Sequence, residues 1–62
     1  MKNILINEFQ NAGFVVRATS DGIVVSLNRE VYVPEVMAFL DSKFEEIDFI
    51  IRKVDGGVKV IV

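Results

Sequence analysis

The chain repeats one pattern at a spacing of 35 residues, and this repeat constrains its fold more than any other feature. Residues 5–27 and 40–62 align without a gap and are identical at six positions. Each segment shows helical periodicity followed by two short β-branched runs around a turn. We therefore expect a single domain over residues 1–62 that contains a pseudo-repeat of about 1–27 and 36–62. A true duplication and a chance resemblance between two αββ units both explain the identities.

Each unit begins with apolar residues at helical spacing. The first set predicts a helix over about residues 2–12, and Gly13 follows it at a position that suits a left-handed C-terminal cap. In the second unit Pro34, which has no amide proton to lose, suits the first turn of a helix that ends near Phe44. The two apolar stripes are Met1, Leu5, Phe9 and Ala12, and Val36, Leu40, Phe44 and Ile47.

A β-hairpin is predicted after each helix, because two alternating β-branched runs flank an Asp-Gly turn. The first hairpin turns at Asp21-Gly22 and the second at Asp55-Gly56. The connector Asn28–Val33 has room for a short extra strand over Val31–Val33.

An α-β-β-α-β-β order predicts an α+β fold with one four-stranded, mainly antiparallel sheet and both helices on one face. The same arrangement results when the first strand of a ferredoxin-like β-α-β-β-α-β chain moves to the end. Alternation along the strands divides their side chains between the two faces. The inner face is expected to carry Phe14, Val16, Ile23, Val25, Leu27, Phe49, Ile51, Val58, Val60 and Val62.

The opposite, outer face of the predicted sheet is unusually apolar for a solvated surface. It is expected to have an aliphatic centre with basic residues around it, which indicates a surface for a partner. Exposed β-branched residues also occur simply because strands favour them. The candidate interface comprises Val15, Arg17, Val24, Ile50, Arg52, Lys59 and Ile61.

Small size and composition favour self-association. A chain of 62 residues buries only about 60% of its unfolded surface, and it has neither cysteine nor histidine to supply a disulfide or a common zinc site. Hydrophobic residues nevertheless make up 52% of the chain. We therefore expect a homodimer or larger oligomer, with another protein as a further partner for the outer face or for an exposed strand edge.

Nucleic-acid binding is an alternative that would use Arg17, Arg52, Lys53 and Lys59 as a modest basic patch. Single-strand binders usually add aromatic side chains on which bases stack, and the predicted outer strands have none. The net charge of −2 also argues against a strongly basic footprint.

No residue cluster indicates an enzyme, a cofactor or a metal site. Asp21 and Asp55 lie in turns, where a carboxylate bonds to nearby backbone and glycine supplies the dihedral angles. The serines have no candidate general base. No apolar run approaches the roughly 18 residues that span a bilayer, so we expect a cytoplasmic protein.

The first 44 residues resemble HicA-type toxins, small ribonucleases with a double-stranded-RNA-binding-like fold. The resemblance lies in a helix that ends Asn11-Ala12-Gly13-Phe14, a hairpin, and Val31-Tyr32-Val33-Pro34 before a second helix. Those toxins depend on a histidine in the first hairpin, and this chain has no histidine. The resemblance therefore implies an inactive relative as a third alternative.

Overall fold

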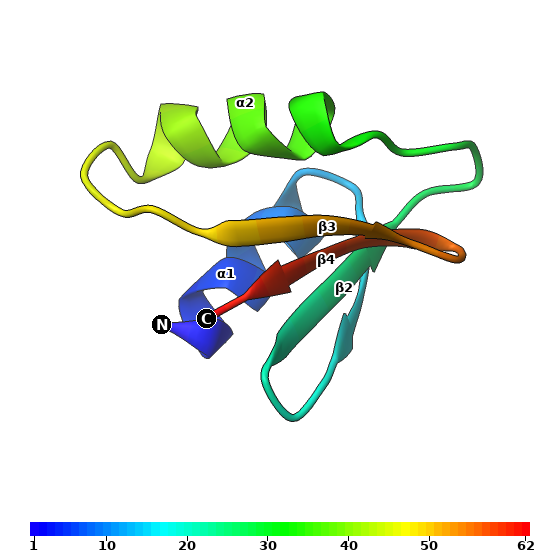
Figure 1. Cartoon of the computed structure of the whole chain (residues 1–62), viewed down its shortest axis with the longest axis horizontal. Helices are drawn as coiled ribbons and strands as arrows, with labels where there is room; N and C mark the ends of the chain where they lie inside the picture. The colour runs from blue at the N-terminus through cyan, green and yellow to red at the C-terminus, as the bar shows by residue number, and fades with distance from the viewer.

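The computed structural model describes residues 1–62 and contains two helices and four strands in the expected order (Figure 1). Both predicted helices and the four predicted hairpin strands are present, and their ends lie within a few residues of the predicted ones. The first unit comprises α1 (Lys2–Asn11), β1 (Val15–Ala18) and β2 (Gly22–Ser26), and the second comprises α2 (Val33–Lys43), β3 (Ile50–Val54) and β4 (Gly57–Ile61).

The four strands form one sheet in the order β1-β2-β4-β3, with every neighbouring pair antiparallel. This confirms the predicted α+β class. The order is the one produced by moving the first strand of a ferredoxin-like chain to its end. Strands β2 and β4 are central, so β1 and β3 each leave one edge without a partner strand.

The two hairpins pair in the same register once the 35-residue spacing is applied. Val16 lies opposite Val25 in the first hairpin, and Ile51 lies opposite Val60 in the second. The pairing of β2 with β4 follows the same relation, so that an approximate twofold axis passes through the pair Val24 and Lys59. This axis exchanges the cross-strand pair Ile23–Val60 with the pair Val25–Val58.

The contacts between aromatic rings follow the same 35-residue relation as the strand registers. The rings of Phe9 and Phe14 meet edge to face at 5.3 Å, and those of Phe44 and Phe49 do so at 5.8 Å. The first pair also receives Phe39 from α2, whose ring centroid lies 4.6 Å from that of Phe9. The halves are thus related in sequence position, strand register and aromatic contacts, while their origin by duplication stays a prediction.

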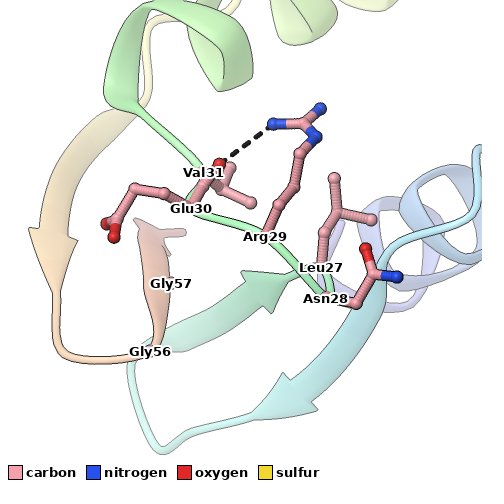
Figure 2. Close-up of a pocket in the computed structure, with 7 residues that line it drawn as sticks. All are labelled: Leu27, Asn28, Arg29, Glu30, Val31, Gly56 and Gly57. Carbon is pink, nitrogen blue, oxygen red and sulfur yellow. Dashed lines mark hydrogen bonds between the residues drawn. The ribbon is translucent and has the colours of Figure 1, made fainter.

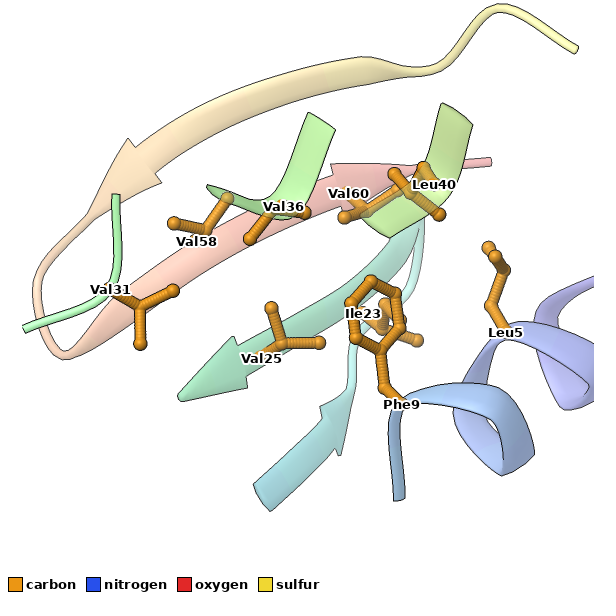
Figure 3. Close-up of a cluster of buried hydrophobic side chains, with 9 residues drawn as sticks. All are labelled: Leu5, Phe9, Ile23, Val25, Val31, Val36, Leu40, Val58 and Val60. Carbon is orange, nitrogen blue, oxygen red and sulfur yellow. The ribbon is translucent and has the colours of Figure 1, made fainter. Parts of the chain in front are cut away.

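The core contains residues from both helices and from one face of the central strands (Figure 3). Alternation places four of these residues on the same side of β2 and β4, as the sequence predicts. Phe14, Val16, Leu27, Phe49 and Ile51 are partly buried around this cluster. The buried residues are Leu5, Phe9, Ile23, Val25, Val31, Val36, Leu40, Val58 and Val60.

The connector between β2 and α2 differs from the prediction. No extra strand forms over Val31–Val33, because Val33 already begins α2. Val31 instead turns into the core and is only 2% exposed. A single buried valine therefore fixes a segment that has no regular structure of its own.

The ends of the predicted apolar stripes lie at the surface. Val62 was expected on the inner face but is 46% exposed. Met1 and Ile47, the outermost stripe residues, are 50% and 41% exposed, and Ala12 is exposed as well. These positions lie beyond the regular elements, where strand and helix periodicity no longer determines which way a side chain points.

Two equivalent glycines let the central strands approach each other closely. A Cβ atom at Gly22 would overlap the backbone carbonyl oxygen of Val60, and one at Gly57 would overlap that of Val25. Neither glycine has a positive φ, so glycine is required at these positions because the neighbouring strand leaves no room for a side chain.

Candidate interaction surfaces

The candidate interface residues lie on the face of the sheet opposite the core, as alternation predicts. One row crosses all four strands at the middle of this face. Because each member lies opposite the next in the strand register, the row runs Arg17, Val24, Lys59 and Arg52.

The strongly exposed aliphatic residues of the outer face, Val15 and Ile50, are at its corners. Val15 and Ile50 are equivalent in the two halves and are 66% and 58% exposed. Val24, expected at an accessible aliphatic centre, is only 7% exposed. Its cross-strand neighbours Arg17 and Lys59 have long aliphatic stems that flank it. The centre of the face is therefore cationic.

The row contains one ion pair. The Nζ atom of Lys59 lies 2.9 Å from Oδ1 of Asp21, and the Thr19 hydroxyl donates to the same oxygen at 3.1 Å. These contacts, the one from Lys59 foremost, lower the pKa of Asp21 below its ordinary value of 3.8. Arg17 and Arg52 are exposed and pair with no acidic side chain, so the row retains a net positive charge.

Lys53 does not belong to this basic row. It lies opposite Val58, a core residue, and therefore points to the helix side of β3. There its Nζ atom lies 2.8 Å from a carboxylate oxygen of Glu30 in the connector. Of the four basic residues considered for nucleic-acid binding, three share a surface and the fourth is neutralised elsewhere.

An apolar groove of about 490 Å³ lies beside the outer face, where both chain ends meet the start of β3. Six of its seven lining residues are hydrophobic. Four of the large apolar side chains exposed on this protein, Met1, Ile47, Ile50 and Val62, gather in it. The complete lining is Met1, Ile47, Asp48, Phe49, Ile50, Ile61 and Val62.

The connector borders a second, more polar hollow of about 380 Å³ with the turn residues Gly56 and Gly57 (Figure 2). Arg29 donates two hydrogen bonds to the carboxylate of Glu35, at 3.1 and 2.6 Å, and a third to the carbonyl of Glu30. The Arg29 guanidinium lowers the pKa of Glu35 below its ordinary value. These contacts hold the connector against the rest of the fold.

The structure contains no group of three or more metal-ligating side chains, and neither helix has the length and apolar character needed to cross a membrane. A comparison with known protein families, curated proteins and solved structures found no match to this chain.

The residues that resemble HicA-type toxins fold as α1, the first hairpin and α2, with the connector rather than a strand before α2. The groove was missed by sequence reasoning, because it joins residues from the two chain ends and the loop before β3. The signal available was the apolar character of Met1, Ile47 and Val62 beyond the regular elements.

Proposed function

We propose that this protein is a small, non-enzymatic interaction module that self-associates through the apolar groove and the adjoining edge of β3. The observation that carries the proposal is the concentration of half-exposed aliphatic side chains in one place. Met1, Ile47, Ile50 and Val62 contact water there, although burial of such side chains contributes about 1.5–3 kcal/mol each. Exposed apolar patches of this kind mark interaction sites.

The charge distribution supports the groove over the outer face as the self-association surface. Two outer faces stacked on each other would bring two rows of Arg17, Lys59 and Arg52 together. Like charges placed together across an interface cost several kcal/mol. The groove lining has a single ionisable side chain, that of Asp48, so two grooves brought together would place fewer like charges against each other.

A concentration series by light scattering or sedimentation tests the proposal. We expect the average mass to rise from one chain toward two between low and high micromolar protein. A strict monomer at high micromolar concentration that is also stable to heating would contradict the proposal.

Replacement of Ile50 by glutamate is expected to raise the dimer dissociation constant at least about tenfold, because dimerisation would then desolvate a carboxylate. Val15→Glu is the matched control. Val15 is the equivalent strand residue and is similarly exposed, but it lies outside the groove. Sedimentation of both variants provides the measurement, and an equal loss of association in the two would argue against the groove.

The cationic row supports a second candidate function, weak binding of nucleic acid through phosphates. Here we expect the double variant Arg17→Glu, Arg52→Glu to lose binding to a single-stranded oligonucleotide at low salt, with Lys53→Gln unchanged because Lys53 points to the other face. Binding of the unaltered chain should weaken steeply as salt increases. Fluorescence anisotropy measures this, and absence of binding at low salt would exclude the candidate.

A further inference from the structure

The free edge of β1 presents backbone groups that have no partner within the chain. The Thr19 N–H donates to the Gly22 carbonyl at 2.8 Å, so these two residues form a hydrogen-bonded pair of the first hairpin. Such pairs alternate along an antiparallel ladder, and Arg17 is therefore the next residue of β1 that bonds to β2. The N–H and C=O groups of Val16 and Ala18 point away from β2, and no side chain bonds to them.

The equivalent edge of β3 is blocked by Lys53. The 35-residue relation places Lys53 where β1 has Ala18, and both lie opposite core residues and so point to the helix side. The Lys53 Nζ atom is held there by the carboxylate of Glu30 at 2.8 Å and by the carbonyl of Gly57 at 3.2 Å. An inward-pointing lysine on an edge strand prevents another strand from pairing with it. Ala18 has no such side chain, so β1 is the open edge.

The two faces of the β1 edge differ in character. On the helix side, Ile6 and Val16 are half-buried against the core. Ile6 faces this edge because it lies on the opposite side of α1 from Glu8, which contacts Lys43 of α2. On the outer face, Arg17 is exposed and pairs with no acidic side chain. The edge thus has an aliphatic rim on one face and an unpaired cation on the other.

We infer that the edge of β1 binds an extended segment of another protein as an added antiparallel strand, with a carboxylate opposite Arg17 and aliphatic residues on either side of it. A polypeptide fits because the edge offers both N–H donors and C=O acceptors, and a peptide backbone complements both at strand spacing. The neighbours of the carboxylate lie on the helix side, opposite Val16 and Ala18, where they extend the aliphatic rim. The inference goes beyond self-association, because it uses the edge of the sheet opposite the groove.

A second copy of this chain fits the β1 edge less well. Two copies of β1 can pair only where their free groups meet, that is, with Val16 opposite Val16 or Ala18 of the other copy. These registers place Arg17 opposite Val15 or opposite Arg17 itself. β1 contains no acidic residue, so a copy leaves the guanidinium unpaired or repelled. A strand from another protein can supply the carboxylate that this chain lacks here.

A peptide titration followed by amide NMR tests the inference. The probe is a capped peptide with a central glutamate, a valine on each side of it and a threonine at each end. We expect the amide signals of Val16 and Ala18 to shift and to exchange more slowly with solvent, because these amides gain hydrogen bonds. The signals of Ile51 and Lys53 should stay in place. No shift at Val16 and Ala18 up to millimolar peptide would overturn the inference.

An exchange of charges identifies the partner of Arg17. Arg17→Glu should weaken binding of the glutamate peptide at least about fivefold, because a like-charged pair replaces an opposite one. A second peptide, with lysine in place of the glutamate, should bind Arg17→Glu better than it binds the unaltered chain. Arg52→Glu is the matched control, since Arg52 is the equivalent residue on the blocked strand. Equal losses for the two variants would contradict a carboxylate placed opposite Arg17.

Transfer of the blocking lysine tests why β1 is the open edge. Ala18→Lys should abolish the peptide-induced shift at Val16, and Lys53→Ala should allow the same peptide to shift the amide of Ile51. Ala38→Lys, at an exposed position of α2, adds the same charge away from the edge and should leave binding unchanged. If the peptide bound Ala18→Lys as well as it binds Ala38→Lys, strand addition at β1 would be wrong.

The same spectra separate this inference from self-association. Shifts at Val16 and Ala18 that depend on protein concentration without peptide would assign the edge to a second copy and overturn the binding of a foreign strand. A chain that stays monomeric at every concentration but binds the peptide would support the inference and contradict self-association alone.

Discussion

Gly22→Ala is expected to destabilise the fold severely. The new methyl group would overlap the carbonyl oxygen of Val60, and a backbone atom in the neighbouring strand cannot move away by changing a rotamer. Strands β2 and β4 would have to separate at the only place where the two halves of the sheet join. We expect a loss of about 3 kcal/mol or more, the upper part of the range for overpacking.

The total stability of a 62-residue domain is about 3–9 kcal/mol, so this change can unfold the protein. Urea denaturation followed by circular dichroism measures the loss. Gly57→Ala should behave alike, because Gly57 occupies the equivalent position beside Val25.

Gly13→Ala is the control for the change of residue type. Gly13 has a φ of 96°, but no atom lies within 4 Å of a Cβ placed there. Its substitution should cost only the left-handed backbone penalty of about 1–2 kcal/mol. Equal losses for Gly22→Ala and Gly13→Ala would show that close strand approach is not what Gly22 provides.

Phe9→Ala is the second change with a large expected effect. Phe9 is fully buried, and its ring contacts both Phe14 and Phe39. Removal of a buried phenylalanine typically costs about 3–5 kcal/mol, since the cavity that remains adds to the lost transfer free energy. Thermal unfolding should therefore begin near room temperature or below.

Phe44→Ala offers a control from within the same molecule. Phe44 is equivalent to Phe9 and contacts Phe49 edge to face, but it is only partly buried. A smaller loss is expected, because part of its ring already contacts water and the site can relax. Equal losses of stability for Phe44→Ala and Phe9→Ala would show that the degree of burial does not determine what each phenylalanine contributes.

The regular part of the fold could be predicted because short-range signals agreed with one another. The Asp-Gly turns, Gly13 after the first helix and Pro34 at the start of the second set the element order. Alternation then placed Ile23 and Val60 in the core. In each case the decisive interaction lies within a few residues along the chain.

The rest depended on contacts between distant segments. Val31 lies in a connector without regular structure, and its burial depends on packing with distant residues of α2 and β4, such as Val36 and Val58. Strand alternation alone directs Lys53 to the face opposite Arg52, but its ion pair with Glu30 requires the connector to lie beside β3. Arg17 and Lys59 likewise flank Val24 only because the sheet order β1-β2-β4-β3 places their strands on either side of β2.

The sheet order has a consequence for the route of folding. Each αββ unit contains contacts between neighbouring segments, so its loops close over short distances along the chain. Only the pairing of β2 with β4 and the docking of the helices connect the units. Loop closure between distant segments slows folding, and we expect the joining of β2 to β4 to be the late, rate-limiting step. Gly22 and Gly57 would then control how quickly two partly formed halves become one protein.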